Sequence, residues 1–386
     1  MEPILLKGIT WDHTRGMVPL QAAAQRFSEL HPNVEICWSK RSLQAFADYS
    51  IEQLSEEYDL LIIDHPWVGS ASVTGCVLPL NEYLPKELLA TLEANSAGAS
   101  HQSYAYNGQQ WALAIDAATP VASMRADLLE AHNVPVPQTW GEVLALAKKG
   151  RVAAPAIPID LLMNFYTFCI ARGGEPFGNE KVISDATGTA ALDSMKAFYS
   201  VLDRSFFSRN PIAVAEVMSS TDDYWYCPFA YGYANYSRRN YSRHRLTYTG
   251  LVTFNGAPLR TTLGGTGIAV AAQSAHKSVA VDFVQFVCAP RWQASEYILN
   301  GGQPGYTFGY ADACNNQVCR DFFKSTGAAL EQAYLRPRYH GYLHFQDAAG
   351  FYIQEFLKGN IQSPQAVLRK LNALYAESLQ KQATLL

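Results

Sequence analysis

Apolar and polar positions along the first third of the chain predict strands separated by helices. Residues 4–11 and 34–38 have the pattern of buried strands, and the spacing over residues 20–30 predicts an amphipathic helix after a loop at 12–19. Residues 58–64, with the sequence YDLLIID, have an uninterrupted apolar centre, which is typical of a strand buried on both faces of a parallel sheet. Strands that alternate with helices indicate a doubly wound α/β sheet, whose ligands bind beyond the carboxyl ends of the strands.

Two polar loops follow these predicted strands and are candidates for ligand contact. His13 and Arg15 precede a helix, where free backbone N–H groups and a guanidinium can hold a carboxylate or phosphate; a solvated loop is the alternative. Asp64 and His65 can bind hydroxyl groups, and the indole of Trp67 can stack on a ring. The structural alternative is that Asp64 caps a turn and Trp67 packs under the sheet.

The segment 106–140 combines a strand, a break and a new α/β unit. Residues 111–115 are predicted to form a strand, and Pro120 is expected to interrupt its hydrogen-bond ladder. Thr139 and Glu142 have the spacing of a capping box, which predicts the start of a helix. Helices are also expected over residues 43–56, 348–357 and 363–383, the last with proline at its first position.

Composition narrows the class of protein. A chain of 386 residues with 48% apolar and 17% charged residues indicates a folded protein of two lobes. The net charge of −4 and the lack of a dense basic tract argue against nucleic-acid binding, and no apolar run reaches the ~18 residues of a membrane span. The start of the chain lacks the features of a secretory signal, so we expect a cytoplasmic protein, or a periplasmic one if a signal peptide was removed.

The cysteines and the catalytic motifs point away from a disulfide framework and from an enzyme. Seven cysteines, mostly in apolar runs, do not form a paired set, although Cys314 and Cys319 are close enough in sequence to pair. His340 and His344 have helical metal-ligand spacing but lack the glutamate of a zincin, and Cys227 has no nearby base. We expect no catalytic residue, no metal and no cofactor.

Residues 222–236, DDYWYCPFAYGYANY, are the most aromatic part of the chain. Aromatic faces and tyrosine hydroxyls suit sugar rings and other planar ligands. A strand is predicted at 226–230, so alternate residues of this strand face the core whatever the function is.

Several short motifs, in their order and spacing, resemble the extracellular solute-binding proteins of family 1, which are the substrate-binding components of sugar-type ABC importers. They are spread over nearly the whole chain, and each is weak alone. The motifs are VLPLNEYLP at 77–85, the segment 106–120 that begins with YNG, QTWGE at 138–142, GGEP at 173–176, GGTG at 264–267 and RPR at 336–338.

The resemblance implies an α/β, bilobal periplasmic-binding-protein-like fold of type II, in which hinge crossovers join two doubly wound α/β lobes that close on a ligand. The crossovers are expected near residues 116–120 and 263–268, where glycines let the backbone approach a ligand. The expected N-lobe contains residues 1–116 and 268–325, and the expected C-lobe contains residues 117–267 and 326–386.

The resemblance also implies where the ligand contacts lie. The aromatic segment returns to the cleft between the lobes, which favours its later residues over Trp225, and Trp140 is expected to be structural. The expected ligand-binding residues are His13, Arg15, Asp64, His65, Trp67, Asp116, Thr119, Tyr231, Tyr233, Asn235, Gly265 and Thr266.

We therefore expect a monomeric solute-binding protein that captures a small polar ligand, a carbohydrate or polyol, in that cleft. It would serve an ABC permease or act as an intracellular binding or sensor protein. Two alternatives stay open. One is an enzyme on the same fold, with His13, Asp64, His65 or Asp116 as acid or base. The other is a binder of a small carboxylate, because Arg15 and its neighbours are more charged than a plain sugar site requires.

Overall fold

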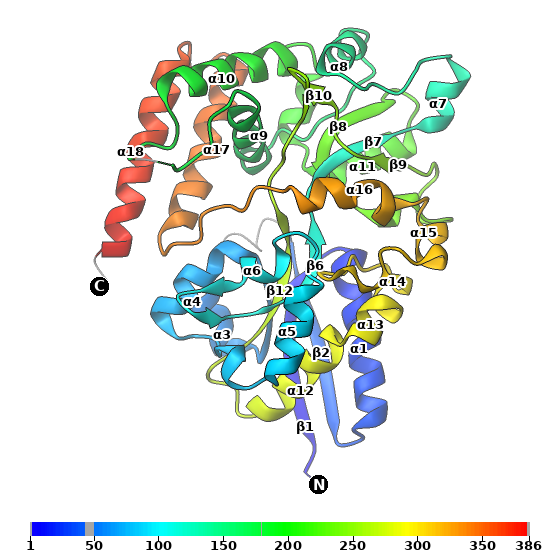
Figure 1. Ribbon diagram of the computed structural model, residues 1–386, viewed down its shortest axis with the longest axis vertical. Helices are drawn as coiled ribbons and strands as arrows, with labels where there is room; N and C mark the ends of the chain where they lie inside the picture. Colours follow the sequence, from blue (N-terminus) through cyan, green and yellow to red (C-terminus); the bar gives the residue numbers. More distant parts are fainter. Residues whose placement is uncertain (1, 43–49, 179, 384–386) are drawn as a thin grey trace. The chain divides into compact units, whose positions relative to one another are not determined.

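The computed structural model describes residues 2–42, 50–178 and 180–383 and divides into two compact units (Figure 1). The chain passes from one unit to the other after Ala118 and returns after Thr262, with further passages in its last quarter. Unit 1 consists of Met1–Ala118, Leu263–Gln317 and Arg338–His340, and unit 2 consists of Thr119–Thr262, Val318–Pro337 and Gly341–Leu386.

A five-stranded mixed sheet forms the centre of unit 1. Its order is β2-β1-β3-β12-β6, where β1 pairs in parallel with β2 and β3, and β12 pairs antiparallel with β3 and β6. The carboxyl ends of β1, β3 and β6 and the start of β12 therefore lie at one end of the sheet, which we call the carboxyl end. The strands are β1 (Ile4–Trp11), β2 (Val34–Arg41), β3 (Leu60–Ile63), β6 (Leu113–Ala118) and β12 (Gly264–Val270).

The core of unit 1 follows the apolar pattern of the sequence. All four residues of β3 are buried, as expected for a central strand covered on both faces. Helices α1 (Thr14–Leu30) and α12 (Lys277–Cys288) contact each other, and apolar side chains from both, including Phe27 and Phe283, pack in the same core cluster as the strands.

The predicted loop at 12–19 is wrong, because α1 already begins at Thr14. The imidazole of His13 accepts a hydrogen bond from the backbone N–H of Arg15 and caps the helix, which begins six residues before the expected start at residue 20. Pro19, the last residue of the expected loop, lies inside this helix.

The expected break in the ladder before Pro120 is present, although it comes later than residue 115. β6 ends at Ala118, and Pro120 is the first residue of β7 (Pro120–Met124), a strand of another sheet, where its register partner is Tyr231. Proline is tolerated at the first position of a strand, where its missing N–H removes little of the ladder.

Unit 2 has a small antiparallel sheet beside a layer of long helices. β7 lies between β8 (Tyr226–Tyr231) and β9 (Thr247–Thr249). Helix α17 packs on α9 and α18, and α10 packs on α9 and α18 (Figure 1). The long helices are α9 (Pro158–Ala171), α10 (Asp185–Tyr199), α17 (Tyr342–Lys358) and α18 (Pro364–Ala383).

An aromatic cluster around Trp140 anchors unit 2. Trp140 begins α8 (Trp140–Ala147), and the predicted capping box of Thr139 and Glu142 is confirmed at its start. The indole of Trp140 is stacked on the ring of Phe229 and lies edge to face against Phe168. The rings of Phe198 and Phe254 are tilted against it. Trp140 is therefore structural, as expected.

The predicted helix over 43–56 is described only in its last part, as α3 (Ile51–Glu57), because residues 43–49 lie outside the described residues.

The remaining described elements are short. In unit 1 they are α3 (Ile51–Glu57), α4 (Val68–Thr74), α5 (Lys86–Ala94), α6 (Ser100–Ser103), β4 (Ala105–Tyr106), β5 (Gln109–Gln110), α13 (Pro290–Ala294) and α14 (Glu296–Leu299), with the 3-10 helices η1 (His65–Trp67), η2 (Leu80–Glu82) and η5 (Thr307–Gly309). The others are α7 (Ala126–Ala131), η3 (Arg204–Ser208), α11 (Pro211–Ser220), η4 (Ala234–Ser237), β10 (Thr253–Phe254), β11 (Ala257–Pro258), α15 (Ala313–Val318) and α16 (Phe322–Glu331).

No disulfide bond joins any of the cysteines of the described residues, so Cys314 and Cys319 do not pair with each other. Within the described residues, no helix combines the length and the apolarity that crossing a bilayer requires.

Candidate functional site

Most of the predicted ligand-binding residues gather at the carboxyl end of the unit 1 sheet. The loop after β1, the turn after β3, the end of β6 and the start of β12 all lie there, so residues far apart in sequence become neighbours. This group consists of His13, Arg15, Asp64, His65, Trp67, Asp116, Gly265 and Thr266.

Arg15 and Asp116 form a buried ion pair. Arg15 is 3% exposed and Asp116 is 1% exposed. Arg15 Nε donates to Asp116 Oδ2 at 2.9 Å, and Arg15 Nη2 donates to Asp116 Oδ1. Burial raises the pKa of the Asp116 carboxyl, and the charge of Arg15 opposes that shift. The guanidinium proposed as a clamp for a ligand carboxylate thus clamps a carboxylate of the chain itself.

His13 contributes a neutral imidazole to this end of the sheet. Its Nδ1 accepts from the backbone N–H of Arg15 at 3.0 Å. Burial, and then the charge of Arg15, lowers the pKa of His13 to about 4. At neutral pH His13 is therefore a hydrogen-bonding group without charge.

Asp64 and His65 are held together at the end of β3. Asp64 Oδ1 accepts from the backbone N–H of His65 at 2.9 Å and caps η1, which is the structural role considered as the alternative. His65 is 1% exposed, and its Nδ1 lies 3.3 Å from Asp64 Oδ1. Trp67 ends η1 and packs partly buried against the core of unit 1.

Gly265 and Thr266 begin β12 beside Asp116. Gly265 has a φ of +99°, and a Cβ atom there would lie 2.3 Å from the carbonyl oxygen of Asp116, so only glycine fits. Thr266 pairs with Asp116 in the register of β12 and β6 and is 8% exposed. Its buried Oγ1 has no hydrogen-bond partner among the described residues.

The other predicted residues lie in unit 2, around the start of β7 and the end of β8. Thr119 Oγ1 lies 2.8 Å from Thr261 Oγ1 and donates to the carbonyl of Thr262 at 3.0 Å. The hydroxyl of Tyr231 lies 2.9 Å from Thr262 Oγ1. These bonds hold together the two segments at which the chain enters and leaves this part of unit 2.

Tyr233 and Asn235 follow β8 directly. Tyr233 is 6% exposed and precedes η4, and Asn235 lies within η4 and is 4% exposed. The buried Oδ1 of Asn235 lacks a hydrogen-bond partner in the part of the chain that the structure describes. Each unit therefore has one candidate residue with an unsatisfied buried oxygen.

Sequence reasoning missed three polar residues that support these groups. Thr261 and Thr262 hold Thr119 and Tyr231, and Gln303 Nε2 donates to the carbonyl of Ala117 at 3.2 Å. The glycine-rich surroundings of Gln303, GGQPG, are a local signal that could have found it. The two threonines carry no comparable signal, because their role depends on the pairing of distant segments.

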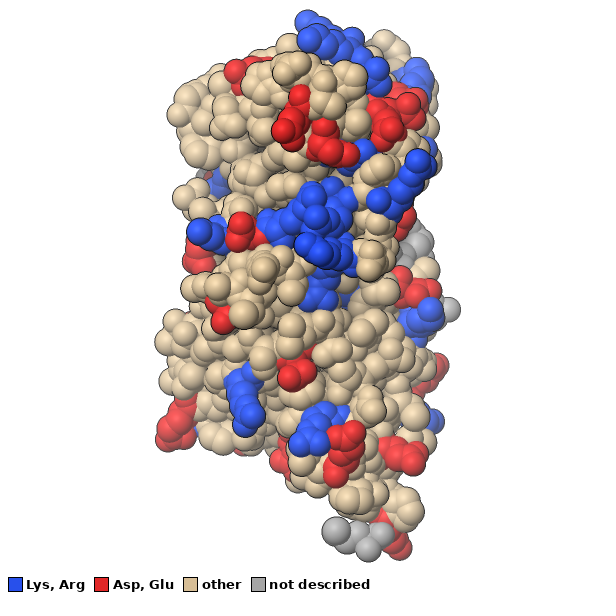
Figure 2. Space-filling model, turned by 90° about the vertical axis from the view of Figure 1, so that its right-hand side faces the viewer, with Lys and Arg blue, Asp and Glu red and all other residues tan. Residues whose placement is uncertain are grey.

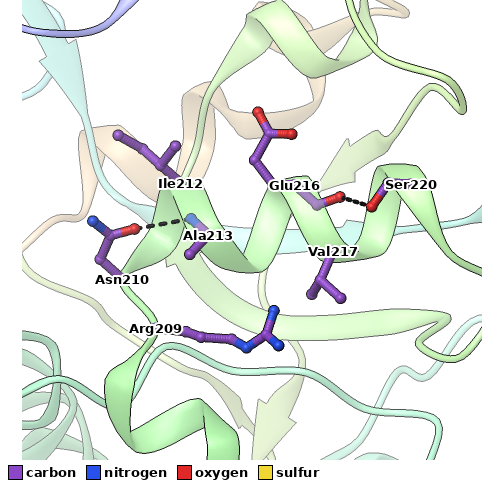
Figure 3. Close-up of a pocket in the computed structure, with 7 residues that line it drawn as sticks. All are labelled: Arg209, Asn210, Ile212, Ala213, Glu216, Val217 and Ser220. Atoms are coloured by element: carbon purple, nitrogen blue, oxygen red, sulfur yellow. Dashed lines mark hydrogen bonds between the residues drawn. The ribbon is translucent and has the colours of Figure 1, made fainter.

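A shallow hollow of about 540 Å³ lies along α11 in unit 2 (Figure 3). Its apolar part is formed by Ile212, Ala213 and Val217, and Arg209 and Glu216 flank it. None of the residues predicted to bind a ligand lines this hollow, so it is a separate feature of the surface.

Metal and thiol chemistry find no support in the described residues. They contain no group of three His, Cys, Asp or Glu side chains that is placed to hold a metal ion. Burial raises the pKa of the Cys227 thiol to about 12, so this cysteine is a poor nucleophile at neutral pH.

Comparison with protein-family models matches residues 22–305 to the family described as bacterial extracellular solute-binding protein. The chain belongs to this family. The resemblance stated from the sequence motifs is thereby confirmed, and the family is one of binding proteins.

Solved structures of other solute-binding proteins share the fold. The maltose-bound MalE3 of T. maritima has a TM-score of 0.85 and 17% identity, with 97% of this chain and 99% of that chain covered. A solute-binding protein of Agrobacterium radiobacter K84 in complex with ribitol has a TM-score of 0.81 and 20% identity, with 96% and 98% covered. One from Agrobacterium vitis S4 with bound D-mannitol has a TM-score of 0.77 and 14% identity, with 98% of each chain covered. The bilobal periplasmic-binding-protein-like fold is confirmed.

Proposed function

We propose that this solute-binding protein captures a neutral carbohydrate or polyol and delivers it to an ABC importer. The observation that carries the proposal is the pair of unsatisfied oxygens, Thr266 Oγ1 in unit 1 and Asn235 Oδ1 in unit 2. A buried polar atom without a partner costs about 1–3 kcal/mol, so a ligand rich in hydroxyl groups would relieve that cost.

The charges of the candidate residues favour a neutral ligand over a small carboxylate. Arg15 is engaged with Asp116, so its charge is compensated within the chain. His13 is neutral above its pKa of about 4. A ligand carboxylate would therefore meet a compensated arginine and a neutral imidazole, whereas hydroxyl groups need only hydrogen-bond donors and acceptors.

Aromatic residues of unit 2 suit the same class of ligand. Tyr231 is the last residue of β8, Tyr233 follows it after Gly232, and in unit 1 Trp67 follows β3. Ring faces next to polar groups are the usual means of binding a sugar ring. The structural relatives with bound maltose, ribitol and D-mannitol add support for this class of solute.

The extracellular description of the family favours the periplasmic alternative for where the protein works. An importer component has to meet its solute outside the cytoplasmic membrane. Separation of periplasmic and cytoplasmic fractions of cells that express the full gene would test this part of the proposal.

A thermal-shift panel of neutral sugars, polyols, sugar acids and carboxylic acids tests the ligand class, because a ligand selective for the folded state raises its stability by mass action. We expect neutral sugars or polyols to raise the melting temperature. Stabilisation by acids alone would favour the carboxylate alternative, and chemical conversion of a stabilising compound would favour the enzyme.

Two variants then test the residues. Thr266→Val and Asn235→Leu should weaken affinity for the stabilising solute by about tenfold each, measured by calorimetry, since each removes one hydrogen bond to the ligand. Ligand-free stability should not fall, because each change removes an unsatisfied atom. The matched control is Thr326→Val, whose hydroxyl already donates to the carbonyl of Phe322 at 2.7 Å. It should cost stability and leave affinity unchanged.

A further inference from the structure

We propose that an arginine-rich loop of unit 2 and the hollow on α11 form a docking surface for an acidic segment of a protein partner. The loop spans residues 238–245, with the sequence RRNYSRHR, and we call it the arginine loop. The partner would be the membrane component of the importer. This identity rests on the proposed function, which the inference deepens.

Positive charge is concentrated here on a chain that is negative overall. Arg239 and Arg243 are exposed on the arginine loop, and Arg245 is half-buried at its end. Arg320, distant in sequence, joins them: its Nη1 donates to the carbonyl of Arg245 at 3.2 Å and to Thr247 Oγ1 at 3.2 Å. On one face of the molecule, Lys and Arg side chains gather into a broad area (Figure 2).

Within residues 2–42, 50–178 and 180–383, no ion pair involves Arg239, Arg243, Arg245 or Arg320. Burial lowers the pKa of Arg320, and the neighbouring charge of Arg245 lowers it further, while the charge of Asp127 opposes the shift. Like charges held together in this way repel each other, and an anionic partner would remove the repulsion.

The loop is held at its base and its end, which preorganises the arginines. The backbone N–H of Leu246 donates to the carbonyl of Tyr236, and Ser237 Oγ donates to the carbonyl of Leu246 at 2.9 Å. The ring of Tyr241 contacts the ring of Tyr236 edge to face, with centroids 5.1 Å apart. A surface fixed before binding loses little conformational entropy when a partner docks.

The arginine loop continues into the hollow on α11. The hydroxyl of Tyr236, at the base of the loop, donates to Glu216 Oε1 at 2.6 Å, and Glu216 flanks the hollow. The backbone N–H of His244 donates to the carbonyl of Ser219 on α11. The surface thus has an apolar depression beside a basic rim, which is the anatomy of a protein interface.

The composition of the surface favours protein carboxylates over a lipid membrane. Arginine binds a carboxylate with two parallel hydrogen bonds, and the arginine loop contains no lysine. Among the described residues, no large apolar side chain between 234 and 250 is exposed, so the loop offers nothing to insert into a bilayer. The apolar hollow instead suits a single apolar side chain next to acidic residues.

The test measures binding of the full chain to labelled poly-L-glutamate by fluorescence anisotropy over a range of salt concentrations. Arg239→Glu combined with Arg243→Glu should weaken binding by at least about tenfold, since both charges are reversed. The matched control, Lys148→Glu with Lys149→Glu, makes the same change at exposed residues of the same unit outside the loop and should leave binding nearly unchanged. Arg239→Lys with Arg243→Lys keeps the charge and should give an intermediate loss, because the two-bond geometry is removed.

Other outcomes would overturn the inference. Equal loss in the lysine control, or no binding of poly-L-glutamate at all, would show that the arginines are only a solvated face. Loop-dependent binding to phosphatidylglycerol vesicles in place of poly-L-glutamate would assign the surface to a membrane. Thermal stabilisation by sugars and polyols is measured on the same variants. If this stabilisation persists while binding of poly-L-glutamate is lost, docking and ligand capture are separate. If no sugar or polyol stabilises the native chain, only the proposed ligand class fails.

Discussion

Among the described residues, each unit buries one aspartate almost completely, and the two aspartates meet different surroundings. Asp116 of unit 1 is paired with Arg15, whereas Asp160 of unit 2 has no cation and its Oδ2 has no hydrogen-bond partner in the described part of the chain. Burial raises the pKa of Asp160 well above its ordinary value. Unit 1 therefore holds a compensated charge pair next to its candidate ligand residues, and unit 2 holds a carboxyl group without a cation, whose burial favours the protonated form. The residue type is the same, and only the presence of a partner decides the charge.

Removing one partner of the unit 1 pair should have the largest effect. Asp116→Ala leaves the Arg15 guanidinium buried without a counter-charge, which should lower the free energy of unfolding by about 3–5 kcal/mol. Urea denaturation measures this loss. The double variant Arg15→Met with Asp116→Leu removes both charges and should recover much of it. A loss that is equally large in the double variant would mean that packing rather than charge dominates.

Asp160→Asn should raise the free energy of unfolding at neutral pH, whereas Asp116→Ala lowers it. Because the folded-state pKa of Asp160 lies above the unfolded value, its contribution to stability is present at low pH and is lost as pH rises through the window between the two values. Within that window, the difference in free energy of unfolding between the variant and the native chain should grow by about 1.4 kcal/mol per pH unit in favour of the variant. Urea denaturation at several pH values checks the slope.

The matched control for this prediction is Asp193→Asn, an exposed aspartate in the same unit. Its stability should follow the native pH profile. A native-like profile in Asp160→Asn as well would show that Asp160 has a compensating partner after all.

His13 should make unit 1 sensitive to acid. Its folded-state pKa of about 4 lies below the ordinary value of 6.5, so its contribution is present above pH 6.5 and is lost as pH falls from 6.5 towards 4. His13→Asn keeps a capping side chain and removes the titration. The variant should reduce the acid-induced loss of unfolding free energy by at most about 1.4 kcal/mol per pH unit between pH 6.5 and 4. Thermal melts from pH 7 to about pH 4 would reveal whether this part of the acid response survives.

The smallest effect is expected at the exposed partners of Arg125. This arginine is 1% exposed, yet its partners Asp127 and Asp222 have side chains that are 54% and 66% exposed. Asp127→Asn should cost only about 1 kcal/mol or less, because Arg125 keeps Asp222 and the carbonyls of Met218 and Thr221. A urea-denaturation loss as large as that of Asp116→Ala would remove the contrast between the compensated pair in unit 1 and the solvated pairs in unit 2.

Local signals in the sequence predicted many of the elements because they depend on neighbouring residues. The apolar centre of 58–64 became β3, the capping box of Thr139 and Glu142 began α8, and α18 begins at Pro364, directly after Ser363. Local signals failed at residues 14–19, which were expected to lie in a loop. His13 caps α1 at Thr14, and Pro19 lies inside that helix.

The candidate site was predictable as a set of segments and not as a set of roles. Residues after β1 and β3 were chosen because strands of one sheet end together, and the structure places them at one end of that sheet. Their roles depend on which side chains meet. Arg15 was interpreted as a clamp for a ligand, whereas its partner is an aspartate 101 positions away.

The sequence by itself determined the α/β rhythm, the family and the segments from which the candidate contacts come, because periodicity, capping and motif order are properties of neighbouring residues. The tertiary structure alone decided the electrostatics: Arg15 is compensated, the pKa of Asp160 is raised by burial, and Arg320 joins the arginines of a distant loop. The physical reason is that the state of a charge depends on its burial and on the groups around it, and both are set by residues that only folding brings together.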